Sequence, residues 1–135
     1  MNIELTDKEF RRLLDLVYIG NWILNSTREK DRFEGYDILQ EKLFALCAKN
    51  GMNALISRWQ GHIFPSSAYE NGGIHEAIAD YEDAVFFDIL AEELARRDLG
   101  CLDSEPADYT ELNARMDEYM DEFEKSGVEN LVLEA

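Results

Sequence analysis

Residues 74–100 read IHEAIADYEDAVFFDILAEELARRDLG, and this stretch decides the fold. Its apolar side chains recur at intervals of three and four residues, which is the period of an amphipathic helix. The clearest members of the pattern are Ile78, Tyr81, Val85 and Ile89. Several alanines on the same stretch allow a neighbouring helix to approach closely, and Gly100 supplies a helix end. We therefore predict a long core helix that begins near Ile74.

A second core helix is predicted near the start of the chain. Thr6-Asp7-Lys8-Glu9 has the spacing of a capping box, so a helix should begin here. The apolar residues between Leu13 and Leu24 are too many for one narrow stripe, which indicates burial on more than one side until about Asn25. These two helices are expected to form the centre of the fold.

Other signals predict two more long helices and one break. Ser26-x-x-Glu29 matches an N-cap pattern, and it predicts a helix that continues to Cys47 and ends at Asn50-Gly51. Residues 52–59 predict a short helix. Residues 60–73 hold three glycines, two serines, one proline and one asparagine, which break any regular pattern and predict one long irregular loop. The last helix is predicted to hold Pro106 in its first turn and to end at Gly127. Residues 128–135 form a short tail that docks on the body or adds a minor strand.

The fold class predicted from these elements is all-α, a compact bundle of four long helices with a short fifth. A chain of 135 residues fits one ordinary domain, so a single helical domain over residues 1–135 is expected. The N-terminal residues show no basic region followed by an apolar run, and no apolar stretch is long enough to span a bilayer. Cys47 and Cys101 lack metal-like spacing and are expected to be free thiols. We expect a soluble, cytoplasmic protein that does not bind membranes.

The charge of the chain is unevenly distributed. Residues 1–75 hold ten acidic against nine basic side chains, and residues 76–135 hold nineteen against four. The C-terminal half therefore carries a net charge of −15 out of a total of −16. Such a charge repels nucleic acid and anionic membranes and favours cationic partners. Because the basic residues near the N-terminus are interleaved with acidic ones, direct nucleic-acid binding is not expected either.

The acidic residues of the last helix are the candidate partner-binding site. Two like-charge pairs at a spacing of four residues, Asp117 with Asp121 and Glu118 with Glu122, each oppose helix formation by about 0.2–0.5 kcal/mol. Either the face is kept for solubility, or it meets a basic partner. In one form of the second hypothesis, carboxylates mimic the phosphates of a nucleic acid toward a nucleic-acid-binding protein. The residues assigned to this site are Asp117, Glu118, Asp121, Glu122 and Glu124, together with Trp59 directly before the loop and His62 and Tyr69 within it.

An alternative hypothesis is a metal-dependent hydrolase. Asp80-x-x-Asp83 and Glu34-x-x-Asp37 each place two carboxylates on one helix face, and Mg²⁺ or Mn²⁺ takes oxygen ligands of this kind. The arrangement is similar to that of all-helical nucleotide pyrophosphatases, in which Glu-x-x-Glu and Glu-x-x-Asp pairs face each other. In a chain with 29 acidic residues, however, such pairs also arise by chance.

No other chemistry is indicated. The sequence has no Glu-x-x-His pair, no glycine-rich phosphate loop and no nucleophile motif, so we assign no catalytic residue and no cofactor. The leading hypothesis is a small acidic, non-enzymatic protein-interaction domain that binds a basic protein through its C-terminal half. A third hypothesis is that the wide apolar surface forms a homodimer.

Overall fold

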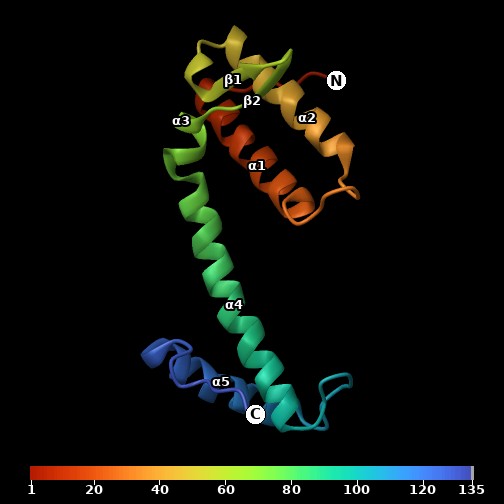
Figure 1. The fold of residues 1–135 in the computed structure, drawn as a ribbon, viewed down its shortest axis with the longest axis vertical. Coiled ribbons are helices and arrows are strands. Elements are labelled where there is room, and N and C mark those ends of the chain that lie inside the picture. Colours follow the sequence, from red (N-terminus) through yellow and green to blue (C-terminus); the bar gives the residue numbers. More distant parts are fainter. Residues whose placement is uncertain (135) are drawn as a thin grey trace. The chain divides into compact units, whose positions relative to one another are not determined.

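The computed structural model describes residues 1–134 and confirms the all-α class. The four long helices are α1 (Asp7–Asn25), α2 (Glu34–Ala45), α4 (His75–Asp98) and α5 (Tyr109–Ser126), and a short helix, α3, spans Ser67–Tyr69 (Figure 1). One small antiparallel sheet joins β1 (Ile56–Trp59) to β2 (His62–Pro65). The chain divides into two compact units, Met1–Ile78 and Ala79–Ala135, and the division falls within α4. The prediction of one domain stays a prediction, because compact units of one chain can fold together or separately.

The first unit is built around an aromatic core. Its α1 begins as predicted, because the Thr6 hydroxyl accepts a hydrogen bond from the Glu9 N–H (3.1 Å) and the Glu9 carboxylate accepts one from the Thr6 N–H (3.0 Å). The buried cluster draws on α1, α2, the hairpin, α3 and the start of α4. It consists of Phe10, Leu14, Tyr18, Phe44, Cys47, Ile56, Tyr69, Ile74 and Ile78.

The expected helix start at Ser26 is wrong. Ser26 instead ends α1, since its N–H donates to the Trp22 carbonyl (2.9 Å), and α2 begins only at Glu34. Asn25 explains the delay: its side-chain amide donates to the Phe33 carbonyl (3.1 Å) and its side-chain oxygen accepts from the Phe33 N–H (2.8 Å). This pair of bonds fixes the backbone at Phe33, the residue that precedes α2.

The short helix predicted at 52–59 and the irregular loop predicted at 60–73 are also wrong. Residues 53–55 form one 3-10 turn, and a two-residue hairpin follows with Trp59 paired to His62. Gln60 and Gly61 both have positive φ (48° and 78°), as a type I′ hairpin turn requires. Beyond β2, α3 and a π-helical turn at Glu70–Ile74 lead into α4, and Gly73 with φ 112° makes the kink between them.

The second unit packs α5 against the C-terminal part of α4. Its buried residues are Ala91, Ala95, Cys101, Pro106, Leu112 and Phe123. Pro106 lies before α5 and not in its first turn, because Asp108 is the N-cap and accepts a hydrogen bond from the Thr110 N–H (2.8 Å). Gly127 ends α5 as predicted, with φ 55°. Residues 131–134 form no strand and are exposed.

None of the helices formed by residues 1–134 is both long and apolar enough to cross a bilayer. Cys47 and Cys101 are both buried free thiols.

Candidate functional site

Three of the five acidic residues predicted on the last helix lie on one exposed stripe of α5. Asp117, Asp121 and Glu124 follow one another at spacings of four and three residues on α5, so they lie along one stripe of the helix. Within residues 1–134, none of the three forms an ion pair or accepts a side-chain hydrogen bond. Glu118 and Glu122 are different, because Glu118 pairs with Arg115 (2.7 Å) and Glu122 accepts from Asn130 (2.6 Å). We call Asp117, Asp121 and Glu124 the α5 stripe.

The basic residues of the second unit are largely committed elsewhere. Arg97 and Arg115 both bind the Asp98 carboxylate (2.9 and 2.8 Å), and the Tyr119 hydroxyl also donates to it. The hydrogen bond from Tyr119, together with the two guanidinium groups, lowers the pKa of Asp98 to about 2. Arg96 pairs with Glu92 (3.1 Å) and donates to the Ser104 carbonyl (3.1 Å). In the described part of this unit, these contacts occupy all three arginines, so none of them pairs with the α5 stripe.

The other three predicted binding residues, Trp59, His62 and Tyr69, lie in different surroundings. Trp59 is 65% exposed at the end of β1, and His62 stands opposite it in the hairpin. Nδ1 of His62 lies 3.1 Å from the Glu41 carboxylate, which also accepts from the Ile63 N–H (2.8 Å). The Ile63 N–H, more than His62, lowers the pKa of Glu41. Glu41 thereby fastens β2 to α2.

Tyr69 is buried and cannot contact a partner, so its assignment as a binding residue is wrong. Its side chain is fully buried, in edge-to-face contact with Tyr18 (5.3 Å) and Phe44 (5.1 Å). Its hydroxyl donates to Asp15 (2.8 Å), and the guanidinium of Arg11 lies over its ring. Burial raises the pKa of the phenol far above its usual value, with a further contribution from Asp15. The aromatic ring of Tyr69 is therefore part of the core of the first unit.

The metal hypothesis finds no supporting arrangement. No group of three His, Cys, Asp or Glu side chains in residues 1–134 has the geometry to hold a metal ion. Within its own pair, Asp37 is bound by Arg32 and Asn21, and Glu34 is exposed. Asp80 and Asp83 are both exposed on α4. These four residues stay predicted ligands only.

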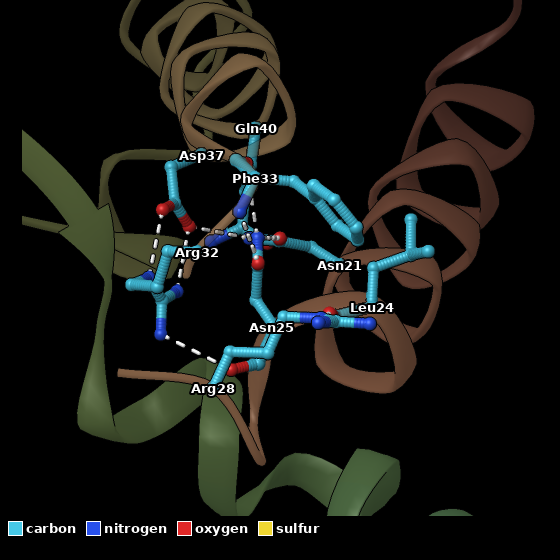
Figure 2. A network of polar contacts seen from close by, with 8 residues as sticks. All are labelled: Asn21, Leu24, Asn25, Arg28, Arg32, Phe33, Asp37 and Gln40. Atoms are coloured by element: carbon cyan, nitrogen blue, oxygen red, sulfur yellow. Dashed lines mark hydrogen bonds and ion pairs between the residues drawn. The ribbon is translucent and has the colours of Figure 1, made fainter. Parts of the chain in front are cut away.

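A cleft in the first unit was not predicted from the sequence. It has a volume of about 750 Å³ and lies between α1, α2 and β2. Figure 2 shows the polar network beside it: Asn21 of α1 donates to Asp37 (3.0 Å) and to Gln40 (3.2 Å) of α2, and Asn25 donates to the Asn21 side-chain oxygen (2.6 Å). Two asparagines four residues apart within an apolar helix were the sequence signal for this network, since buried amides require partners.

Among residues 1–134, Arg32 is the only arginine that lines the cleft, and its guanidinium is bound by groups of the first unit. Arg32 binds both oxygens of Asp37 (2.8 and 3.0 Å) and donates to the Asn25 carbonyl (3.3 Å), as Figure 2 shows. The hydrogen bonds from Arg32 lower the pKa of Asp37. The remaining acidic residues of the lining are Glu34, Glu41 and Glu70. With Arg32 and Asp37 cancelling, the lining carries a net charge of −3 when His62 is neutral.

Aromatic rings form much of the rest of the cleft wall. Trp22 and Phe64 both line it and are 36% and 44% exposed. Trp22 is held edge-to-face against His75 (4.9 Å) and stacks with Tyr18. Tyr18 is fixed in turn, since its hydroxyl lies 2.7 Å from Nε2 of His75. The cleft therefore combines fixed rings with carboxylates.

Comparisons of the chain with protein families, with curated proteins and with solved structures give no match.

Proposed function

We propose that this protein is a non-enzymatic interaction domain whose second unit binds the basic surface of another protein. The observation that carries the proposal is the α5 stripe: three exposed carboxylates in a row, in a unit whose arginines are bound to other acidic groups. Residues 79–135 hold eighteen acidic against four basic side chains, so the whole unit carries a net charge of −14. This field attracts a cationic surface, including that of a protein that otherwise binds nucleic acid.

The division of charge supports the same proposal. Residues 1–78 hold eleven acidic against nine basic side chains, a net charge of −2. The charge boundary found in the sequence and the boundary between the compact units therefore fall within a few residues of each other. A charge needed only for solubility would have no reason to be confined to one unit, because colloidal stability depends on the net charge of the whole molecule.

The test is capture of proteins from the native host on three baits. One bait is the wild-type chain, and the second neutralises the α5 stripe by Asp117→Asn, Asp121→Asn and Glu124→Gln. The third makes the same change in charge on exposed residues of the first unit and of the start of α4, by Glu4→Gln, Glu29→Gln and Glu76→Gln.

We expect a protein with a basic surface that the wild-type and third baits retain and that the second bait binds about tenfold more weakly, since each exposed charge pair contributes a fraction of a kcal/mol. Its binding to the wild type should weaken as salt is raised from 50 to about 300 mM, because exposed charges are screened. If the second bait retains every protein as well as the third does, the α5 stripe is only a solubilising face and the proposal fails.

A further inference from the structure

We propose that the cleft between α1, α2 and β2 is a binding site for an organic cation, specifically for a guanidinium group. The site lies wholly within the first unit, so it does not depend on the α5 stripe or on the function proposed for it. The argument rests on the charge of the cleft, on its aromatic wall and on its size.

The charge of the cleft selects a cation. Glu34 and Glu70 both line it, and neither takes part in an ion pair or accepts a side-chain hydrogen bond within residues 1–134. Glu70 is half-buried, where a charge is screened by water less than on an open surface. Arg32 cannot attract an anion effectively, because its guanidinium already donates to both oxygens of Asp37 and to the Asn25 carbonyl. A cationic ligand would supply the counter-charge that the lining lacks.

The aromatic wall selects a planar cation over a compact ammonium ion. Trp22 and Phe64 both line the cleft, and tryptophan is the strongest aromatic partner for a cation. A guanidinium stacks on such rings and at the same time donates two parallel hydrogen bonds to a carboxylate, whereas an ammonium acts as a point charge. The first unit already uses this mode of contact, since the guanidinium of Arg28 lies 4.4 Å from the centre of the Phe33 ring.

The size and rigidity of the cleft fit a small ligand. Its volume of about 750 Å³ lies within the range of about 300–1,000 Å³ that small-molecule sites occupy. The walls are held in place before a ligand arrives, because Tyr18, Trp22 and His75 fix one another and Asn21 ties α1 to α2. Fixed walls reduce the entropy lost on binding.

The experiment uses Trp22 as the reporter. The chain has two tryptophans, so a Trp59→Phe background leaves Trp22 as the only one. N-acetyl-arginine amide is titrated into this protein while tryptophan fluorescence and binding heat are followed. N-acetyl-citrulline amide serves as the matched ligand, since its urea group has nearly the same shape as a guanidinium but no charge. We expect the arginine compound to bind at least about tenfold more tightly.

Two variants test where the ligand binds. Glu70→Gln should weaken arginine binding about fivefold, whereas Glu29→Gln removes the same charge from an exposed residue outside the lining and should leave it unchanged. Far-UV circular dichroism and the urea midpoint confirm that both variants fold. The variant with the α5 stripe neutralised should bind the arginine compound as the wild type does.

A second arm identifies the source of the guanidinium. If a pentapeptide Gly-Gly-Arg-Gly-Gly with blocked ends binds more tightly than N-acetyl-arginine amide, the site receives an arginine side chain of a protein; if it binds more weakly, the site receives a free small molecule. Either result supports a guanidinium site. The proposal is overturned if the citrulline compound binds equally well, if neither compound binds at about 10 mM, or if Glu29→Gln or the neutralised α5 stripe weakens binding as much as Glu70→Gln does.

Discussion

Replacing Asn25 with alanine should destabilise the first unit by about 3 kcal/mol. Asn25 is 1% exposed, and its side chain makes three hydrogen bonds: one to the side chain of Asn21 and two to the backbone of Phe33. Each bond contributes about 1 kcal/mol to stability, and a buried group left without a partner costs more than that. The alanine methyl group replaces none of these bonds, so the turn between α1 and α2 loses its attachment.

The assay follows from the distribution of the tryptophans. Trp22 and Trp59 both lie in the first unit, so tryptophan fluorescence during urea denaturation reports on that unit alone. Asn53→Ala is the matched control, because Asn53 is exposed in the same unit and its side chain makes no hydrogen bond within residues 1–134. We expect the control to lie within about 0.5 kcal/mol of the wild type.

The Asn25→Asp variant separates hydrogen bonding from packing. Aspartate has the shape of asparagine, but at neutral pH its carboxylate only accepts, so one oxygen would face the Asn21 side-chain oxygen and the Phe33 carbonyl. We expect a loss at pH 7 at least as large as that of Asn25→Ala, and a smaller loss below about pH 4, where a protonated carboxyl can donate. The reasoning is refuted if Asn25→Ala costs less than about 1 kcal/mol, or if Asn25→Asp is as stable as the wild type at pH 7.

Three further predictions concern other parts of the chain. Gly73→Ala should cost about 1–2 kcal/mol in urea denaturation and Gly72→Ala almost nothing, because an added Cβ meets no atom at either position and only Gly73 has a positive φ. Tyr69→Phe should cost about 1 kcal/mol by the same assay, through loss of the hydrogen bond to Asp15; an unchanged midpoint would contradict this. The pKa of Asp98, about 2, is below the ordinary value of 3.8, so its contribution to stability is complete above the ordinary value and lost as the pH falls from about 4 to about 2. Asp98→Asn should therefore cost about 1 kcal/mol at pH 7, after allowance for solvent screening, and only a small part of that at pH 2, where about half of the Asp98 carboxyl groups are still ionised; circular dichroism measures this against the control Asp103→Asn.

Features that depend on neighbouring residues were predictable. Thr6 and Glu9 close a capping box within one turn of α1, and Gly127 ends α5 because a left-handed residue can close a helix. The helical period from Ile74 onward predicted α4. Each of these signals is complete within a few residues, so no tertiary contact was needed to interpret it.

Features that depend on distant residues were not predictable. Residues 56–65 form a hairpin whose second strand is fastened by the Glu41 carboxylate at the Ile63 N–H, a contact across 22 positions of the chain. Tyr69 looked like a loop residue because its sequence neighbours are polar, yet it packs against Tyr18 and Phe44, which come from other elements. The order of residues along the chain does not show which distant residues come into contact in the fold.

The sequence by itself determined the amount of charge and its division along the chain, since both follow from counting side chains. Only the tertiary structure decided which charges remain free. Asp98 and Arg115 are 17 positions apart and neutralise each other, whereas Asp117, Asp121 and Glu124 keep their charges uncompensated within residues 1–134. The same holds for the cleft, whose aromatic wall and carboxylates come from four separate elements. The physical reason is that hydrogen bonds and ion pairs form only within a few ångströms, and folding alone sets which side chains come that close.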